Sequence, residues 1–113
     1  MPYLAVKSAM PISQEKKAAL QKQIGELISI IPGKTIDNCM TQIEGDCDLY
    51  MSGVEAQAVF CEIRMFGPAP SEAKDELGAK LNDLFRDSLG VQKVYINYLE
   101  FSEWSTDGHY RAL

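Results

Sequence analysis

The order strand, helix, strand occurs twice along this chain, and this duplication constrains the fold more than any other feature of the sequence. Two serines that can cap a helix, Ser13 and Ser71, lie 58 positions apart. The glycines that end the two helical patterns, Gly33 and Gly90, lie 57 positions apart. A strand-helix-strand unit makes a right-handed crossover that places its helix on one face of the sheet. Two such units side by side predict an α+β fold, in which a four-stranded sheet carries two antiparallel helices on one face.

Hydrophobic periodicity assigns the elements of the two units. Apolar residues recur at helical spacing over residues 13–33 and 71–90, so each helix is expected to begin at its capping serine and to end at glycine. Alternating and β-prone stretches predict strands over residues 3–9, 39–44, 49–52, 57–66 and 94–101. Both faces of the 57–66 strand are partly apolar, so the face that the helices leave open also carries apolar side chains. Oligomerisation is the simplest way to cover it.

Length and charge narrow the class of protein. The chain has 113 residues, so we expect a single domain over residues 1–113. Its 16 acidic and 11 basic residues give a formal net charge of −5. This acidity argues against nucleic acid or an anionic membrane as the main partner. No apolar run approaches the roughly 20 residues that cross a bilayer, and the first residues lack the features of a secretory signal, so a cytoplasmic protein is expected.

The cysteines do not indicate a disulfide framework or a metal site. Cys39, Cys47 and Cys61 are odd in number and irregularly spaced, so we expect reduced, buried thiols. Together with His109 they number four potential ligands, but the paired spacing typical of a zinc site is missing. His109 is the only histidine and lies in a polar tail that we expect to be mobile. The sequence therefore predicts neither a metal nor a cofactor.

Pro2 is the residue that most suggests chemistry. Removal of the initiator methionine before proline would leave a secondary amine at the start of a strand. A free N-terminal amine has a reference pKa of about 7.7 to 8.0, and burial lowers that pKa because it disfavours the cation. Such an amine is neutral and basic near neutral pH. In the alternative interpretation, a Met-Pro opening is common and has no catalytic role.

Three further residues each have a structural and a functional interpretation. Lys34 follows the first predicted helix, so its charge either complements the helix dipole or holds an anionic substrate. Tyr95 and Asn97 share one face of the last strand, because side chains alternate along a strand. They either pack against neighbouring strands or line a pocket with hydrogen-bond donors.

Three segments together resemble a known family. They are Met1-Pro2-Tyr3 at the start of a strand, Gly33-Lys34 after the first helix, and residues 94–98, Val-Tyr-Ile-Asn-Tyr, in the last strand. In their order, spacing and the length of the chain they are similar to the macrophage migration inhibitory factor family of the tautomerase superfamily. The ending of the chain, residues 104–113, departs from the usual ending of that family.

The resemblance implies a homotrimer with additional short strands at its interfaces and three active sites between subunits. It implies an isomerase that catalyses keto-enol tautomerisation of phenylpyruvate-like or dopachrome-like substrates without a cofactor. By position, Pro2 would be the base and Lys34 would hold the carboxylate of an aromatic α-keto acid. Met65 falls where the family uses a backbone amide in the pocket, and Tyr95 and Asn97 would come from the neighbouring subunit.

Two other functions remain open at the level of sequence. One is a signalling protein that is secreted without a signal peptide and binds a protein receptor through the trimer surface. The other is a trimeric binding module that has the fold and lacks the chemistry. Neither alternative requires a free Pro2 amine, so a retained Met1 would favour them over the enzyme.

Overall fold

The computed structural model describes residues 2–113 and contains a mixed four-stranded sheet with the strand order β2-β1-β5-β6. Strand β1 pairs in parallel with β2 and antiparallel with β5, and β5 pairs in parallel with β6. The four strands are β1 (Tyr3–Ser8), β2 (Met40–Glu44), β5 (Ala58–Phe66) and β6 (Lys93–Phe101). This arrangement confirms the duplicated strand-helix-strand units.

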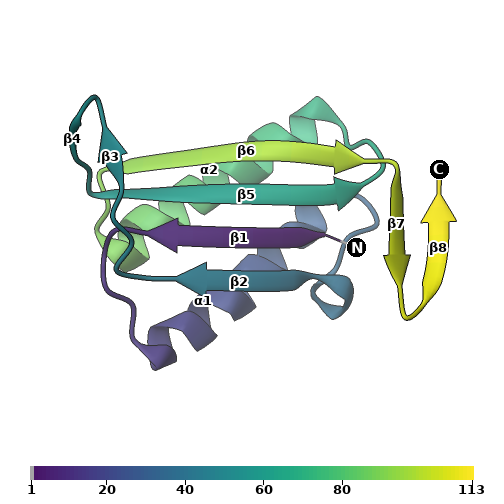
Figure 1. Cartoon of the computed structure of the whole chain (residues 1–113), viewed down its shortest axis with the longest axis horizontal. Helices are drawn as coiled ribbons and strands as arrows, with labels where there is room; N and C mark the ends of the chain where they lie inside the picture. The colour runs from purple at the N-terminus through teal and green to yellow at the C-terminus, as the bar shows by residue number, and fades with distance from the viewer. Residues whose placement is uncertain (1) are drawn as a thin grey trace.

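Both helices lie behind the sheet in Figure 1, and the opposite face is open. Helix α1 (Gln14–Leu27) begins after Ser13, whose hydroxyl accepts a hydrogen bond from the backbone N–H of Lys16, so the predicted cap is confirmed. A 3₁₀ turn, η1 (Ile28–Ile30), continues the chain beyond α1. The α-helix therefore ends earlier than the predicted Pro32-Gly33 boundary.

The predicted cap of the second helix is wrong. Helix α2 (Ser71–Leu89) has Pro70 at the N-cap position, and the Ser71 side chain makes no capping hydrogen bond. Pro70 fits this position because its extended backbone, with ψ of 140°, leaves its carbonyl free to accept the N–H of Lys74. At the other end Gly90 is the C-cap with φ of +67°, a conformation that glycine adopts without strain.

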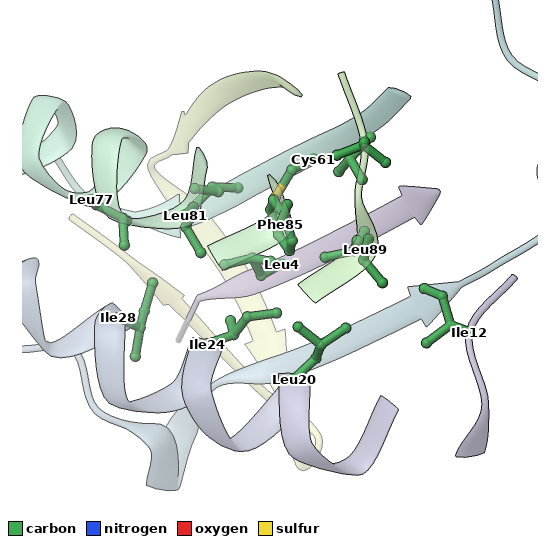
Figure 2. Close-up of a cluster of buried hydrophobic side chains, with 14 of the residues drawn as sticks. Leu4, Ile12, Leu20, Ile24, Ile28, Cys61, Leu77, Leu81, Phe85 and Leu89 are labelled. Atoms are coloured by element: carbon green, nitrogen blue, oxygen red, sulfur yellow. The ribbon is translucent and has the colours of Figure 1, made fainter. Parts of the chain in front are cut away.

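The core lies between the helices and the sheet (Figure 2). Alternation along β5 places one set of its side chains in this layer, and the members of that set are almost fully buried: Val59, Cys61, Ile63 and Met65. The helices contribute fully buried side chains from one face each: Leu20, Ile24, Leu77, Leu81 and Phe85. Burial of this apolar set is the main favourable contribution to the free energy of folding.

Two small hairpins extend from opposite ends of the sheet (Figure 1). The predicted strand over residues 49–52 is present as the shorter β3 (Tyr50–Met51), which forms a hairpin with a strand that was not predicted, β4 (Val54–Glu55). The C-terminal tail, expected to be mobile, is a second hairpin of β7 (Glu103–Thr106) and β8 (His109–Ala112), so that expectation is wrong. The Asp107-Gly108 turn explains it, because both residues have a positive φ of the kind that tight hairpins require.

The cysteines are free thiols, as predicted, but only Cys61 is buried. Cys39 and Cys47 are half-buried, so the expectation that all three are buried is wrong for these two. None of the helices described between residues 2 and 113 has the length and apolar character needed to cross a membrane.

Candidate active site

Pro2 lies at the start of the inner strand β1 and is buried. Its carbonyl accepts the backbone N–H of Met40 at 2.9 Å, which fixes Pro2 against the start of β2. On the other side, Tyr3 is paired with Arg64 near the end of β5. The predicted base is therefore held between two strands. Met1, whose removal would free the Pro2 amine, lies outside the described residues.

Lys34 reaches the same end of the sheet. The chain turns at Gly33, which has φ of +80°, and the backbone N–H of Lys34 bonds to the carbonyl of Ile31 at 3.1 Å. The ammonium of Lys34 then donates to the carbonyl of Phe66, the last residue of β5, at 3.1 Å. Its charge is thus directed at the end of a strand and not only at the end of the preceding helix.

Packing against α1 positions the loop that follows Lys34. Gly25 of α1 is buried, and a side chain at this position would overlap Ile36 in the 3₁₀ turn η2 (Ile36–Asn38). Asn38 closes that turn, because its side-chain oxygen accepts the backbone N–H of Thr35. The helix surface therefore sets the position of the Lys34 loop.

Met65 lies next to this site but directs its side chain away from the open face. That side chain is fully buried in the core. The Met65 side chain therefore takes no part in the site. The following residue, Phe66, is half-buried and faces the open side of the sheet.

Tyr95 and Asn97 share one face of β6, as predicted, and the structure shows that it is the open face, on which both are exposed. Tyr95 lines an apolar cavity of about 190 Å³ together with Leu49, Tyr50 and Met51, and the Lys93 ammonium lies 5.8 Å from the centre of its ring. This cavity is at the β3–β4 end of the sheet, far from Pro2.

Strand register gives the distance of Tyr95 and Asn97 from Pro2 within one chain. Tyr3 pairs with Arg64, and Arg64 pairs with Leu99, so Pro2 lies level with the residue after Leu99. Tyr95 is five residues further back along β6, about 16 Å at the usual rise of a strand. One chain thus brings together Pro2, Lys34 and the Met65 backbone but not Tyr95. Asn97 is nearer but still about 10 Å along the strand from the level of Pro2.

An aromatic cluster beside this site was missed by the sequence analysis. The rings of Phe66, Phe101 and Trp104 have centroids 5.5 to 6.5 Å apart, a normal range for aromatic pairs. Phe66 and Phe101 are register partners at the ends of β5 and β6, and Trp104 comes from β7. The signal in the sequence was the pair of aromatic residues ending two adjacent strands.

Charge is also organised at this end of the sheet. Glu100 accepts the backbone N–H of Ala69 at 2.7 Å and pairs with the ammonium of Lys74 at 3.0 Å. The hydrogen bonds from Lys74 and Ala69 lower the pKa of Glu100. This carboxylate therefore fixes the turn between β5 and α2. On the β2 side, burial raises the pKa of the Cys39 thiol, which favours its neutral form.

Fold and site together define the class of protein. It has duplicated β-α-β units, a buried proline at the start of the inner strand β1, and a loop lysine whose ammonium reaches the end of the neighbouring strand β5. Residues 1–109 match the family model of macrophage migration inhibitory factor. The chain belongs to the macrophage migration inhibitory factor family, within the tautomerase superfamily. A comparison with curated proteins gives no match.

Solved structures share the fold at low identity. MIF2 of Leishmania major has a TM-score of 0.89 at 18% identity, covering 98% of this chain and 97% of the other. The MIF-like protein of Entamoeba histolytica has a TM-score of 0.85 at 19% identity, covering 97% and 98%. N1, a member of the cis-3-chloroacrylic acid dehalogenase family, has a TM-score of 0.81 at 20% identity, covering 95% and 81%. The predicted family and the α+β fold are confirmed.

Proposed function

We propose that this protein is a cofactor-independent keto-enol tautomerase of aromatic α-keto acids such as phenylpyruvate. The observation that carries the proposal is the position of Pro2, buried at the start of β1 beside the strand end that receives the Lys34 ammonium. A buried Pro2 amine at the same end of the sheet as the Lys34 ammonium suits a substrate that carries a carboxylate near an acidic C–H bond. The similar structure of Pt0534 is one inactivated by 2-oxo-3-pentynoate, which is itself a 2-oxo carboxylate.

The reaction moves one proton and needs no oxidant. With Met1 removed, the neutral Pro2 amine takes a proton from the carbon next to the keto group, and the electron pair of that C–H bond moves toward the carbonyl oxygen. Backbone N–H groups at the end of β5, near Met65, stabilise the charge on that oxygen before it is protonated. Lys34 holds the carboxylate and so orients the C–H bond toward the amine.

The complete site is proposed to form between subunits of a homotrimer. Tyr95 and Asn97 are too far from Pro2 along their own sheet, so they would line the aromatic end of a neighbour's site. Both ends of the molecule carry exposed apolar residues, among them Tyr50 and Val54 in one hairpin and Tyr110 in the other. Head-to-tail contact between such ends closes a ring and covers both.

The test compares protein with a free Pro2 amine, verified by intact mass, with protein that keeps one residue before Pro2. The free form should tautomerise phenylpyruvate, followed by enol absorbance, and the blocked form should be inactive with the same circular dichroism. Pro2→Gly keeps a primary amine and should retain partial activity. Equal turnover by free and blocked protein would refute Pro2 as the base. Inactivity of both would favour the signalling or binding alternatives.

Lys34 is tested by comparing two substrates. Lys34→Ala should lower kcat/KM for the keto acid by roughly tenfold or more, since a charge-assisted contact is worth about 1.5 to 3 kcal/mol. The loss should be much smaller for the methyl ester of the same keto acid, which has no carboxylate. Equal losses for acid and ester would show that Lys34 does not hold the carboxylate.

A further inference from the structure

The C-terminal hairpin meets the sheet through Trp104. Its indole lies 5.5 Å from the Phe66 ring, with 31° between the two ring planes, and 6.5 Å from the ring of Phe101. The hairpin stands beside the end of the sheet at which β1 starts (Figure 1). Trp104 thus closes a three-ring cluster at the strand end that also receives Lys34.

The indole N–H of Trp104 is buried and has no hydrogen-bond partner among the described residues. Burial of an unpaired donor costs free energy, so natural proteins rarely retain one without a compensating gain. Here the gain comes from the ring, because a large aromatic side chain buries more apolar surface than a smaller one and stacks on its neighbours. Within the described chain, Trp104 therefore contributes through its ring.

Phe66 connects this ring to the site. Its side chain packs against Trp104 and Phe101, while its carbonyl accepts the Lys34 ammonium at 3.1 Å. The backbone of Phe66 is held in the sheet, because Phe66 pairs with Phe101 and the N–H of Gly67 donates to the carbonyl of Phe101 at 2.9 Å. The aromatic contacts add a restraint on the Phe66 ring, which lies on the open face beside the carbonyl that binds Lys34.

We infer that Trp104 is a positioning residue for Lys34, acting through the ring and carbonyl of Phe66. The Trp104 ring fixes Phe66, Phe66 fixes the ammonium, and the ammonium is held where a carboxylate can meet it. The segment in which this chain departs from the usual family ending thus helps to set the preference for carboxylate substrates. This last consequence rests on the proposed function, whereas the coupling of Trp104 to Lys34 does not.

The first measurement follows the Lys34 side chain by NMR in full-length protein labelled with ¹³C at the lysine ε-carbon. In Trp104→Ala and Trp104→Leu the Lys34 signal should move toward the position of solvent-exposed lysines, and in Trp104→Phe it should stay near its wild-type position. The Lys74 signal is an internal control, since its ion pair with Glu100 does not involve the cluster. His109→Ala, which changes an exposed side chain on β8, controls for general disturbance of the hairpin and should leave Lys34 unchanged.

The second measurement is kinetic. Trp104→Leu should raise KM for the keto acid about tenfold, as expected for a misplaced binding group, and should change KM for the ester little. The effect should disappear in a Lys34→Ala background, because both changes remove the same contact. An unmoved Lys34 signal in both Trp104→Ala and Trp104→Leu would overturn the inference, as would a Trp104→Phe variant that behaves like Trp104→Leu. If the wild-type protein has no tautomerase activity, the proposed function fails and the NMR result still decides this inference.

Discussion

Gly25 shows how a single residue sets the position of the Lys34 loop. A side chain here would overlap Cγ1 and Cδ1 of Ile36. Gly25→Ala should therefore destabilise the protein by roughly 1 kcal/mol, because overpacking costs about 1 to 3 kcal/mol and exceeds the helix propensity gained, about 1 kcal/mol. In an Ile36→Ala background the same change should stabilise by about 0.5 to 1 kcal/mol. Urea unfolding measures both, and the same sign in the two backgrounds would contradict this packing.

Cys61 illustrates the effect of complete burial on a reactive group. Burial in the core raises the pKa of its thiol to about 12, with a smaller contribution from Glu62. At pH 8 the native protein should therefore be alkylated by iodoacetamide at the half-buried Cys47 and not at Cys61. Peptide mapping by mass spectrometry measures this, with urea-unfolded protein as the control in which all thiols react. Modification of Cys61 as fast as Cys47 in native protein would contradict its placement.

At the scale of single elements, the two helix starts form a matched pair. Ser13 caps α1 through its hydroxyl, whereas Ser71 is the first helical residue of α2 and caps nothing. Ser13→Ala should lower the free energy of unfolding by about 1 kcal/mol, and Ser71→Ala should change it by only a few tenths of that amount. Thermal unfolding of the two variants measures the difference. A larger loss for Ser71→Ala than for Ser13→Ala would contradict the helix caps in the structure.

The start of α2 is also tied to the end of β6 by a charge. Hydrogen bonds from Lys74 and Ala69 lower the pKa of Glu100, so its ionised form stabilises the folded state. This stabilisation is present above the usual glutamate pKa of about 4.3. It is lost as the pH falls through the lower pKa that Glu100 has in the folded protein. Glu100→Gln should therefore be less stable than wild type at pH 7 and equally stable near pH 2. Glu26→Gln, at a residue with no ion pair among the described residues, is the control. A stability difference that persists at pH 2 would contradict the linkage.

Elements that depend on short-range sequence patterns could be predicted, whereas elements that depend on tertiary contacts could not. The apolar periodicity of β5 and the cap at Ser13 act within a few residues, so the sequence reveals them. The split of the first helix into α1 and η1 and the pairing of β3 with β4 depend on tertiary packing that overrides local propensity. The C-terminal hairpin was missed although Asp107-Gly108 is a turn signal, because its strands are short and exposed.

The residues of the candidate site also divide into those that the sequence could identify and those that it could not. Pro2 and Lys34 occupy special positions in the sequence, next to the start of the chain and just after a helix, and could be selected there. The structure adds that they share one end of the sheet and that the Met65 side chain belongs to the core. Phe66, Phe101 and Trp104 could not be assembled from the sequence, since their contact depends on strand register and on where the last hairpin lies.

For the whole molecule, we expect a trimer. The open sheet face carries exposed Tyr95 and Leu99, and β6 is an edge strand of the four-stranded sheet. Light scattering coupled to size exclusion should give three times the mass of one chain at micromolar concentration. Tyr95→Ala is expected to keep this mass, because its ring would face a neighbour's pocket rather than fill a core. A wild-type monomer under these conditions would rule out the shared site.

In the proposed trimer, Pro2 and Tyr95 of one working site come from different chains, and activity after subunit mixing measures this. One variant has the Pro2 amine blocked by an added residue, the other is Tyr95→Ala, and each alone should have low activity. Co-refolding them in equal amounts should restore about a quarter of wild-type turnover, since that share of sites in a closed ring pairs an intact Pro2 with a neighbour's intact Tyr95. Turnover of the mixture no higher than the mean of the two variants, with trimers formed, would contradict the claim.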